Sequence, residues 1–206
     1  MREPAVVHVV DDDVSQRTAL LRLLGAAGFE TRGYASAGEF LLHPVPDNHG
    51  CVLLDVRMPG PSGLDLQDAL RRQGVTIPVI FLTGHANVDS AVRALKAGAV
   101  DFLSKPVDRD ELFEAIRRAL ELDARRRAEI DEAAELRARF ATLTPRERDV
   151  LDRIVAGKLN KQIADDLGVA ERTVKAERAQ VMQKIGASSP AELGALAERV
   201  RKLGQY

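Results

Sequence analysis

The sequence has a single cysteine and no tryptophan, and aromatic residues account for only 4% of its 206 positions. One cysteine, Cys51, cannot form an intramolecular disulfide, and it excludes zinc sites that need several cysteines. So few aromatic side chains disfavour the stacking platforms with which proteins bind single-stranded nucleic acid. Charged residues, by contrast, make up 30% of the sequence.

Long hydrophobic runs are also missing. No apolar stretch approaches the roughly 18–20 residues that a membrane span needs. The segment Met1–Val10 lacks the pattern of a signal peptide. We therefore expect a soluble protein in the cytoplasm, with no membrane partner.

The charges are divided unevenly along the chain, although the formal net charge is only −1. Residues 1–118 carry a net charge of −3, residues 119–143 a net charge of −1, and residues 144–206 a net charge of +3. An acidic segment, a charged spacer and a basic segment suggest modules that bind different partners. We take these three ranges as the expected domain boundaries.

Residues 1–118 alternate short apolar runs with amphipathic helical patterns. The expected strands are Ala5–Val10, Phe29–Tyr34, Cys51–Asp55, Val79–Thr83 and Val100–Leu103. The expected helices are Val14–Ala27, Ala37–Leu42, Leu64–Arg72, Val88–Ala97 and a helix that begins near Arg109. Five strands that alternate with helices predict an α/β domain with a parallel sheet covered on both faces.

Residues 119–143 are predicted to form a charged helical linker without glycine or proline. Eleven of the nineteen residues 121–139 are charged, and the large apolar residues among them are Leu122, Ile130 and Leu136. One interpretation is a solvated spacer that continues the preceding helix, and the other is a short coiled coil between two chains. The uneven spacing of the three apolar residues does not make a sustained heptad, which favours the spacer.

Residues 144–206 are predicted to be all-helical, with four helices. Thr144-Pro145-Arg146-Glu147 places a helix N-cap, a first-turn proline and a capping-box acid in order. Helices Lys161–Leu167 and Glu171–Ile185 follow, separated by a tight turn, and Pro190–Val200 is the last helix. Two helices joined by a tight turn form a helix-turn-helix.

Three acids stand where predicted strands end: Asp11 and Asp12 after the first strand, and Asp55 at the end of the third. Ligands of an open parallel sheet bind beyond the carboxyl ends of its strands, and carboxylates are the ligands that Mg²⁺ or Mn²⁺ prefers. Helix capping is the alternative for residues 11–13, with Asp13 as the best candidate. Because capping does not account for Asp55, we expect a divalent-cation site at these strand ends.

Two further strand ends add a hydroxyl group, from Thr83, and an ammonium group, from Lys105. A hydroxyl donor and a fixed cation that face a carboxylate and a divalent cation suit an oxyanion that is being phosphorylated. The convergence of these groups at four strand ends argues for a phosphoryl-transfer site.

These strand-end residues form one pattern: Asp11-Asp12, Asp55, Met58-Pro59, Thr83 and Lys105-Pro106. The pattern resembles the receiver domain of two-component response regulators, and the resemblance extends over residues 4–120. It implies a flavodoxin-like, doubly wound five-stranded fold. It also implies that Asp55 accepts a phosphoryl group from the phosphohistidine of a sensor histidine kinase.

The same resemblance implies a set of Mg²⁺ or Mn²⁺ ligands. Asp12 and Asp55 would bind the cation directly, and Asp11 would bind it through water. The backbone carbonyl of Arg57 would be a further ligand.

It also implies a switch. Lys105 would pair with the phosphoryl group, and Thr83 would hydrogen-bond to it after moving inward. Phe102 matches the aromatic switch position of the family, and the bond between Lys105 and Pro106 is expected to be cis.

Two alternatives to this interpretation are disfavoured. An aspartyl-phosphate hydrolase of the haloacid-dehalogenase type would need an acid two residues after its nucleophile, and Arg57 stands there. A regulator that senses a small ligand would need a large apolar pocket rather than an acidic site. We therefore expect no enzyme in the usual sense, since the chain would catalyse only its own phosphoryl transfer and dephosphorylation at Asp55.

The helix Glu171–Ile185 carries basic residues at three-residue spacing: Arg172, Lys175 and Arg178. Its other side carries apolar residues suited to a core: Val174, Val181 and Ile185. A basic face on the second helix of a helix-turn-helix predicts contact with the DNA major groove. An ordinary solvated surface is the alternative, because the net charge of the domain is modest.

Three motifs in residues 143–196 resemble the LuxR-type DNA-binding domain: Thr144-Pro145-Arg146-Glu147, Asn160-Lys161-Gln162-Ile163-Ala164 and Thr173-Val174-Lys175. The resemblance implies a set of DNA-contacting residues: Lys161, Arg172, Thr173, Lys175, Ala176 and Arg178. Within this set, Lys175 and Ala176 would face base edges and Lys161 a phosphate. Arg172 and Arg178 would contact bases or phosphates.

Glu177 departs from the family pattern, since relatives often carry histidine at this position. An acid here could contact a cytosine or repel phosphate, and the sequence does not decide between the two. His85, two residues after Thr83, is a candidate for tuning the lifetime of the phosphoryl group, whereas His8 is expected to be packed inside the sheet.

A receiver, a helical linker and a LuxR-type domain in this order resemble the StyR-like transcriptional regulators of the FixJ/NarL family. The resemblance implies a DNA-binding regulator that phosphorylation activates by remodelling Val88–Ala97 and Val100–Leu103 and promoting dimerisation. The implied partners are a sensor histidine kinase, double-stranded promoter DNA, a second copy of the chain and RNA polymerase. A dimer held constantly through the linker is the alternative, with phosphorylation changing only how the DNA is bound.

Overall fold

The computed structural model describes residues 4–42, 49–84 and 88–203. The chain divides into two compact units, Met1–Arg126 and Arg127–Tyr206. No helix in these described ranges is both long and apolar enough to cross a membrane.

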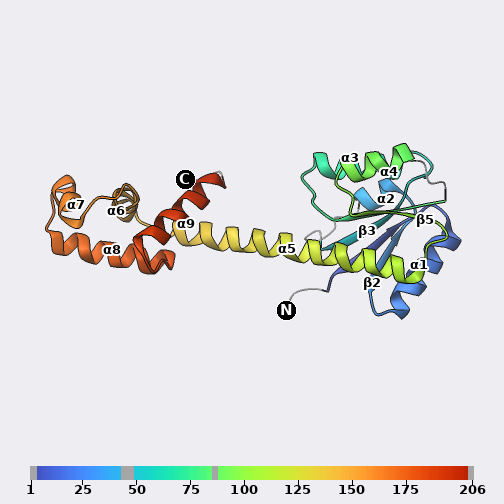
Figure 1. The fold of residues 1–206 in the computed structure, drawn as a ribbon, viewed down its shortest axis with the longest axis horizontal. Coiled ribbons are helices and arrows are strands. Elements are labelled where there is room, and N and C mark those ends of the chain that lie inside the picture. The colour runs from blue at the N-terminus through green and yellow to red at the C-terminus, as the bar shows by residue number, and fades with distance from the viewer. Residues whose placement is uncertain (1–3, 43–48, 85–87, 204–206) are drawn as a thin grey trace. The chain divides into compact units, whose positions relative to one another are not determined.

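The first unit contains a parallel sheet (Figure 1). Its strands are β1 (Val6–Val10), β2 (Glu30–Tyr34), β3 (Gly50–Asp55), β4 (Val79–Thr83) and β5 (Asp101–Ser104). The strand order is β2-β1-β3-β4-β5, and all neighbouring strands pair in parallel. This order confirms the predicted doubly wound five-stranded fold. The direction in which successive strands are added to the sheet reverses between β1 and β3, and sheets of this kind bind ligands at such a reversal.

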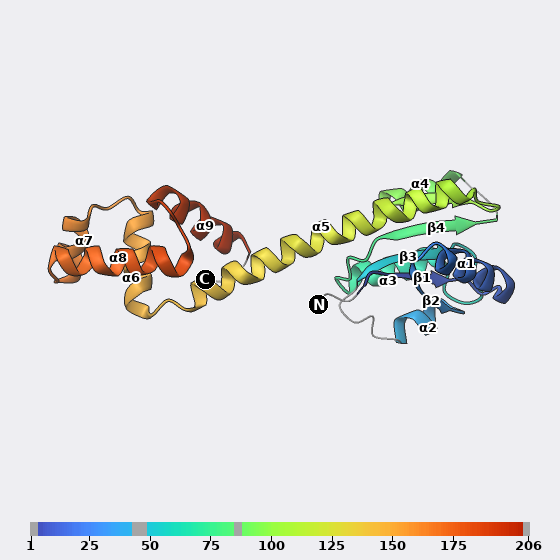
Figure 2. The same cartoon turned by 90° about the horizontal axis from the view of Figure 1, so that it is seen from below.

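Helices cover both faces of the sheet (Figures 1 and 2). They are α1 (Val14–Ala26), α2 (Ala37–Leu42), α3 (Gly63–Arg72), α4 (Val88–Lys96) and the first part of α5 (Arg109–Ala141). Alternate residues of β3 point to opposite sides: Val52 and Leu54 pack with α2, α3 and α4, whereas Cys51 and Leu53 pack with α1 and α5. Every residue of β3 is buried, as expected for a central strand covered on both faces.

Helix α5 runs without a break through most of the predicted linker, which confirms that the linker continues the preceding helix. Its exposure is uneven, however. Ile130 is 59% exposed, whereas Leu136 and Phe140 are buried in the core of the second unit. Asp123 is also buried, although the charged composition predicted a solvated segment.

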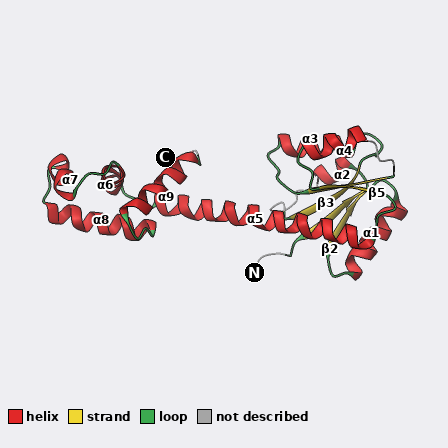
Figure 3. Ribbon diagram, viewed as in Figure 1, coloured by secondary structure: helices red, strands yellow, loops and turns green. Residues whose placement is uncertain are grey.

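The second unit is all-helical in its described residues (Figure 3). Its helices after α5 are α6 (Pro145–Val155), α7 (Asn160–Leu167), α8 (Glu171–Ile185) and α9 (Pro190–Lys202). The predicted capping box is present, because the Thr144 hydroxyl accepts from the backbone of Glu147 and the Glu147 carboxylate accepts from the backbone of Thr144. Helix α7 ends at Gly168, whose φ of +65° produces the tight turn before α8.

His8 lies in the core of the first unit, as predicted. Its Nδ1 atom is hydrogen-bonded to the Tyr34 hydroxyl at 3.1 Å, and its ring packs edge-on against Phe40. Burial, together with the charge of Arg32, lowers the pKa of His8 to about 4. The fold therefore favours the neutral imidazole.

We expect this histidine to make the first unit sensitive to acid. Because its folded pKa is lowered, its contribution is complete above the ordinary pKa of about 6.5 and is lost as the pH falls towards 4. The unit should lose about 2 kcal/mol from this group between pH 7 and pH 5. Hydrogen exchange of β1 and β3 amides in increasing urea measures the loss, which should be smaller in His8→Phe. Equal losses in both proteins would contradict the assignment.

Candidate functional site

An acidic site lies at the carboxyl ends of β1 and β3. The Lys105 ammonium donates to Asp11 at 2.7 Å and to Asp55 at 3.2 Å, so one cation bridges both carboxylates. Asp11 is 2% exposed and Asp55 is 9% exposed. The structure therefore brings together three of the residues that the sequence predicted to meet.

Asp11 and Lys105 lie close enough to Asp55 for their charges to change its pKa, and both acids change the pKa of Lys105. Burial raises the pKa of Asp55 and the nearby Asp11 carboxylate raises it further, while Lys105 acts in the opposite direction. Burial lowers the pKa of Lys105, but its hydrogen bond to Asp11 and the charges of both acids outweigh burial and raise its pKa overall. Asp55 is thus a partly desolvated carboxylate that depends on a neighbouring cation.

Two more predicted residues lie in the adjoining strands β4 and β5. Thr83 ends β4 and is 1% exposed, and its backbone carbonyl accepts from the backbone N–H of Lys105 at 2.7 Å. Phe102 in β5 is half-buried, with its ring centroid 6.0 Å from that of Phe81. The peptide bond between Lys105 and Pro106 is cis, as expected.

Asp12 and Asp13 differ in their surroundings, and Asp13 is the helix cap, as predicted. Asp13 caps α1 and accepts from the backbone of Ser15 and Gln16. Asp12 is exposed. Arg57 donates its backbone N–H to Asp55 at 3.2 Å.

Two buried carboxylates, Asp11 and Asp55, face a single ammonium group, and carboxylate oxygens of this kind suit a hard divalent cation. In the described parts of the chain, no three His, Cys, Asp or Glu side chains converge into a metal-binding cluster. The complete ligand set, including the Arg57 carbonyl, stays a prediction.

Gly63 at the start of α3 lies close against the backbone of Asp55. A Cβ atom at this position would lie 2.2 Å from the backbone oxygen of Asp55, so only glycine allows this approach. The Gly63 N–H also donates to the backbone carbonyl of Val56 at 3.1 Å. Sequence reasoning did not single out this residue, because a glycine reveals its role only through its neighbours.

The predicted DNA-contacting residues lie on α7 and α8. Four of them are exposed: Lys161, Arg172, Lys175 and Ala176. Thr173 is half-buried, and the apolar residues Val174, Val181 and Ile185 are buried in the core as predicted. Two exposed cations, Arg172 and Lys175, therefore lie near the start of α8.

Arg178 lies further along α8. An α-helix turns by about 100° per residue, so Arg178 is turned by about 120° from Arg172. Arg178 is half-buried and donates to the Asn160 side chain in α7 at 3.0 Å. Arg172, Lys175 and Arg178 therefore follow a face that drifts around α8, as three-residue spacing implies.

Glu177 has a partner within its own domain. Its carboxylate accepts from the Arg146 guanidinium of α6 at 3.1 Å, and its side chain is 19% exposed. Neither role considered from the sequence included this pair. The pair offers a structural reason for an acid in α8, since the Arg146 charge offsets it.

A Glu177→Gln variant should therefore lower the stability of the second unit by less than about 1 kcal/mol, because Arg146 is partly solvated. Its base preference in a selection from random DNA should equal that of the wild-type chain. Thermal unfolding and the selection measure both properties. A changed preference at a cytosine would instead assign Glu177 to base contact.

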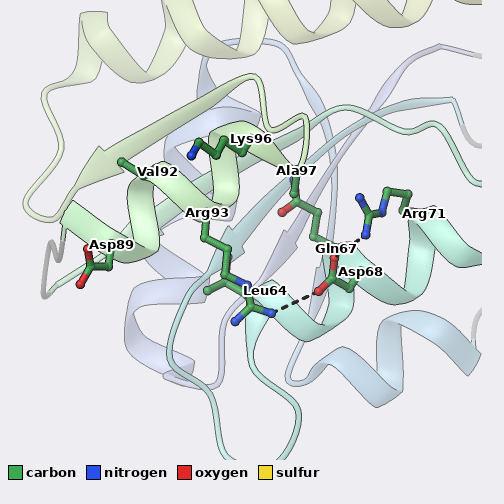
Figure 4. A pocket seen from close by; sticks show the side chains of 9 residues that line it. All are labelled: Leu64, Gln67, Asp68, Arg71, Asp89, Val92, Arg93, Lys96 and Ala97. Carbon is green, nitrogen blue, oxygen red and sulfur yellow. Dashed lines mark hydrogen bonds and ion pairs between the residues drawn. The ribbon is translucent and has the colours of Figure 1, made fainter.

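A groove of about 510 Å³ lies between α3 and α4 (Figure 4). Arg71 and Arg93 both form ion pairs with Asp68, at 3.4 and 3.2 Å, and Gln67 donates to the backbone of Ala94. The Arg93 ion pair and the Gln67 hydrogen bond join α4 to α3, whereas the Arg71 ion pair lies within α3. His85, the residue that the sequence suggested for tuning the phosphoryl lifetime, lies outside the described residues.

Comparisons with known proteins match both units. Residues 7–117 match the response regulator receiver domain, and residues 141–197 match the bacterial regulatory proteins of the luxR family. The chain is 46% identical to nodulation protein W of Bradyrhizobium diazoefficiens over 194 residues, which cover 94% of this chain and 86% of that protein.

Two further relatives extend over nearly the whole chain. The transcriptional regulatory protein FixJ of Azorhizobium caulinodans is 44% identical over 197 residues, which cover 96% of this chain and 93% of that protein. The solved structure of the response regulator StyR has a TM-score of 0.87 and 45% identity, covering 96% of this chain and 100% of that one.

Proposed function

Because the chain belongs to the family of response regulators that join a receiver domain to a LuxR-type DNA-binding domain, we propose that phosphorylation of Asp55 controls its binding to promoter DNA. The observation that carries this proposal is the position of Asp55 at the end of β3, bridged to Asp11 through Lys105. The proposed donor is the phosphohistidine of a sensor kinase, and the proposed place of action is the cytoplasm.

In the proposed reaction, a carboxylate oxygen of Asp55 forms a bond to phosphorus. The bond between phosphorus and the kinase histidine nitrogen breaks, and its electron pair returns to the imidazole, which takes up a proton. Bound Mg²⁺ or Mn²⁺ would neutralise charge on the phosphoryl oxygens. The residues that would hold the cation are Asp11 (through water), Asp12, Asp55 and the Arg57 carbonyl.

Lys105 and Thr83 supply the switch in this proposal. A phosphoryl group on Asp55 gives the Lys105 ammonium and the Thr83 hydroxyl an anionic partner that exists only in the phosphorylated state. A contact present in one state alone shifts the equilibrium towards that state. Phe102, which adjoins Phe81 in the same part of the sheet, would follow the movement of Thr83.

Helix α4 supports the proposal that phosphorylation promotes a homodimer. It leaves three large apolar side chains exposed: Val88 (77%), Val92 (43%) and Leu95 (49%). Exposed apolar surface of this kind marks sites of protein association. In the dimer, two copies of α8 would contact paired half-sites in the major groove of promoter DNA. RNA polymerase is a further proposed partner.

The experiment that tests this function combines gel filtration with DNA titration of the full chain. Both are run with and without Mg²⁺ and beryllofluoride, which mimics the phosphoryl group. We expect beryllofluoride with Mg²⁺ to produce a dimer and to tighten DNA binding. If neither property changes, phosphorylation does not control this protein in the proposed way.

A further inference from the structure

Asp123 is a buried acid on α5, far from the acidic site along the strands of the sheet. It is 4% exposed. Its carboxylate accepts from the backbone N–H of Gly50 at 3.0 Å and pairs with His49 Nδ1 at 2.9 Å. A neighbouring acid on the same helix, Glu121, is 70% exposed on its side chain and pairs with Arg125 within α5.

A buried carboxylate is costly unless hydrogen bonds compensate its lost hydration. The segment that begins β3 supplies such compensation to Asp123 through His49 and Gly50. Arg126, nearly one turn further along α5, donates to the backbone carbonyl of Thr76 at 2.8 Å, just before β4. Asp123 and Arg126 therefore join α5 to the start of β3 and to the segment just before β4.

The Gly50 end of this contact lies close against β1 and accepts only glycine. Gly50 has a φ of +122°, and a Cβ atom there would lie 1.9 Å from the backbone oxygen of Val6. The strand that Gly50 begins ends at Asp55. One buried strand thus has the proposed phosphoacceptor at one end and the α5 contact at the other.

We propose that Asp123 is a positioning residue that fixes α5 to the start of β3 and is required for phosphorylation at Asp55 to change DNA binding. The inference rests on the proposed function. Its physical basis is that α5 continues from this contact to Leu136 and Phe140, which belong to the core of the second unit. If α5 were not fixed at Asp123, it could move on the sheet independently of β3. A change in β3 on phosphorylation of Asp55 would then not be passed to α5.

The test uses the full chain and four variants. Asp123→Ala removes the contacts with His49 and Gly50, whereas Asp123→Asn keeps an oxygen that can accept from Gly50 and removes the charge. His49→Gln keeps a side-chain donor without the ring. Glu121→Gln is the matched control, because it neutralises an exposed acid on the same helix.

Three quantities are measured for each protein: labelling of Asp55 by acetyl phosphate, hydrogen exchange of residues 119–126, and the ratio of DNA affinities with and without beryllofluoride. In Asp123→Ala we expect labelling within about twofold of wild type and roughly tenfold faster exchange. The affinity ratio should fall towards one. Asp123→Asn and His49→Gln should lie between wild type and Asp123→Ala, and Glu121→Gln should match wild type.

An unchanged exchange rate or an unchanged affinity ratio in Asp123→Ala would overturn the proposal. If Asp123→Ala does not fold, the same two measurements on Asp123→Asn decide it. A wild-type chain whose affinity ratio is already one would instead contradict the proposed function. The exchange measurement would then still test whether Asp123 fixes α5.

Discussion

An Asp55→Asn variant is expected to take essentially no label from acetyl phosphate, with a rate at least roughly 100-fold below wild type. The amide cannot act as the nucleophile, although its size and shape match the carboxylate. Its oxygen can still accept from Lys105, so the fold should persist. Phosphate-affinity electrophoresis measures the label, and circular dichroism checks the fold.

Asp110→Asn is the matched control, because Asp110 is an exposed acid at the start of α5. It should be labelled at the wild-type rate. DNA binding by Asp55→Asn should not respond to acetyl phosphate. Labelling of Asp55→Asn at the wild-type rate would place the phosphoacceptor elsewhere in the chain.

The second large effect is expected on DNA affinity. Replacing both Arg172 and Lys175 by alanine should weaken binding by about 100-fold or more at physiological salt, because good base contacts contribute about 1–3 kcal/mol each. The salt dependence should also weaken, with the slope of log K against log salt changing by about 1–2. Fluorescence anisotropy with labelled promoter DNA at several salt concentrations measures both quantities.

Lys202→Ala provides the control for lost positive charge. Lys202 is 75% exposed on its side chain in α9 and pairs with Glu198 of the same helix. It should bind DNA within about threefold of wild type, since exposed charges away from the interface act only weakly. Equal losses in the control and in the double variant would indicate attraction by overall charge rather than contact by α8.

The fold was largely predictable because its signals are local. Apolar runs such as Val79–Thr83 and Cys51–Asp55 end at polar residues, and the structure places β4 and the end of β3 there. The acidic site was predictable for a related reason: strand ends of a parallel sheet meet at one edge, whatever the intervening chain. The meeting of Asp11, Asp55 and Lys105 follows from this topology.

The contacts that escaped prediction join residues far apart in the sequence. Asp123 lies in a charged segment whose composition predicts solvation, and its burial depends on a donor 73 positions away. Glu177 pairs with a residue 31 positions away, and Arg178 with one 18 positions away. No periodicity within one helix contains this information, since it depends on how neighbouring helices pack.

The close approach of α3 to the end of β3 has a consequence for mutational tolerance. Any side chain at residue 63 would displace the backbone of Asp55, because even a Cβ atom would lie 2.2 Å from its oxygen. In a screen of all single substitutions, variants at Gly63 should be lost as severely as variants at Asp55. This should hold although glycine has no functional group to contribute. Such a screen would identify residues required for shape together with residues required for chemistry, and only the structure separates the two.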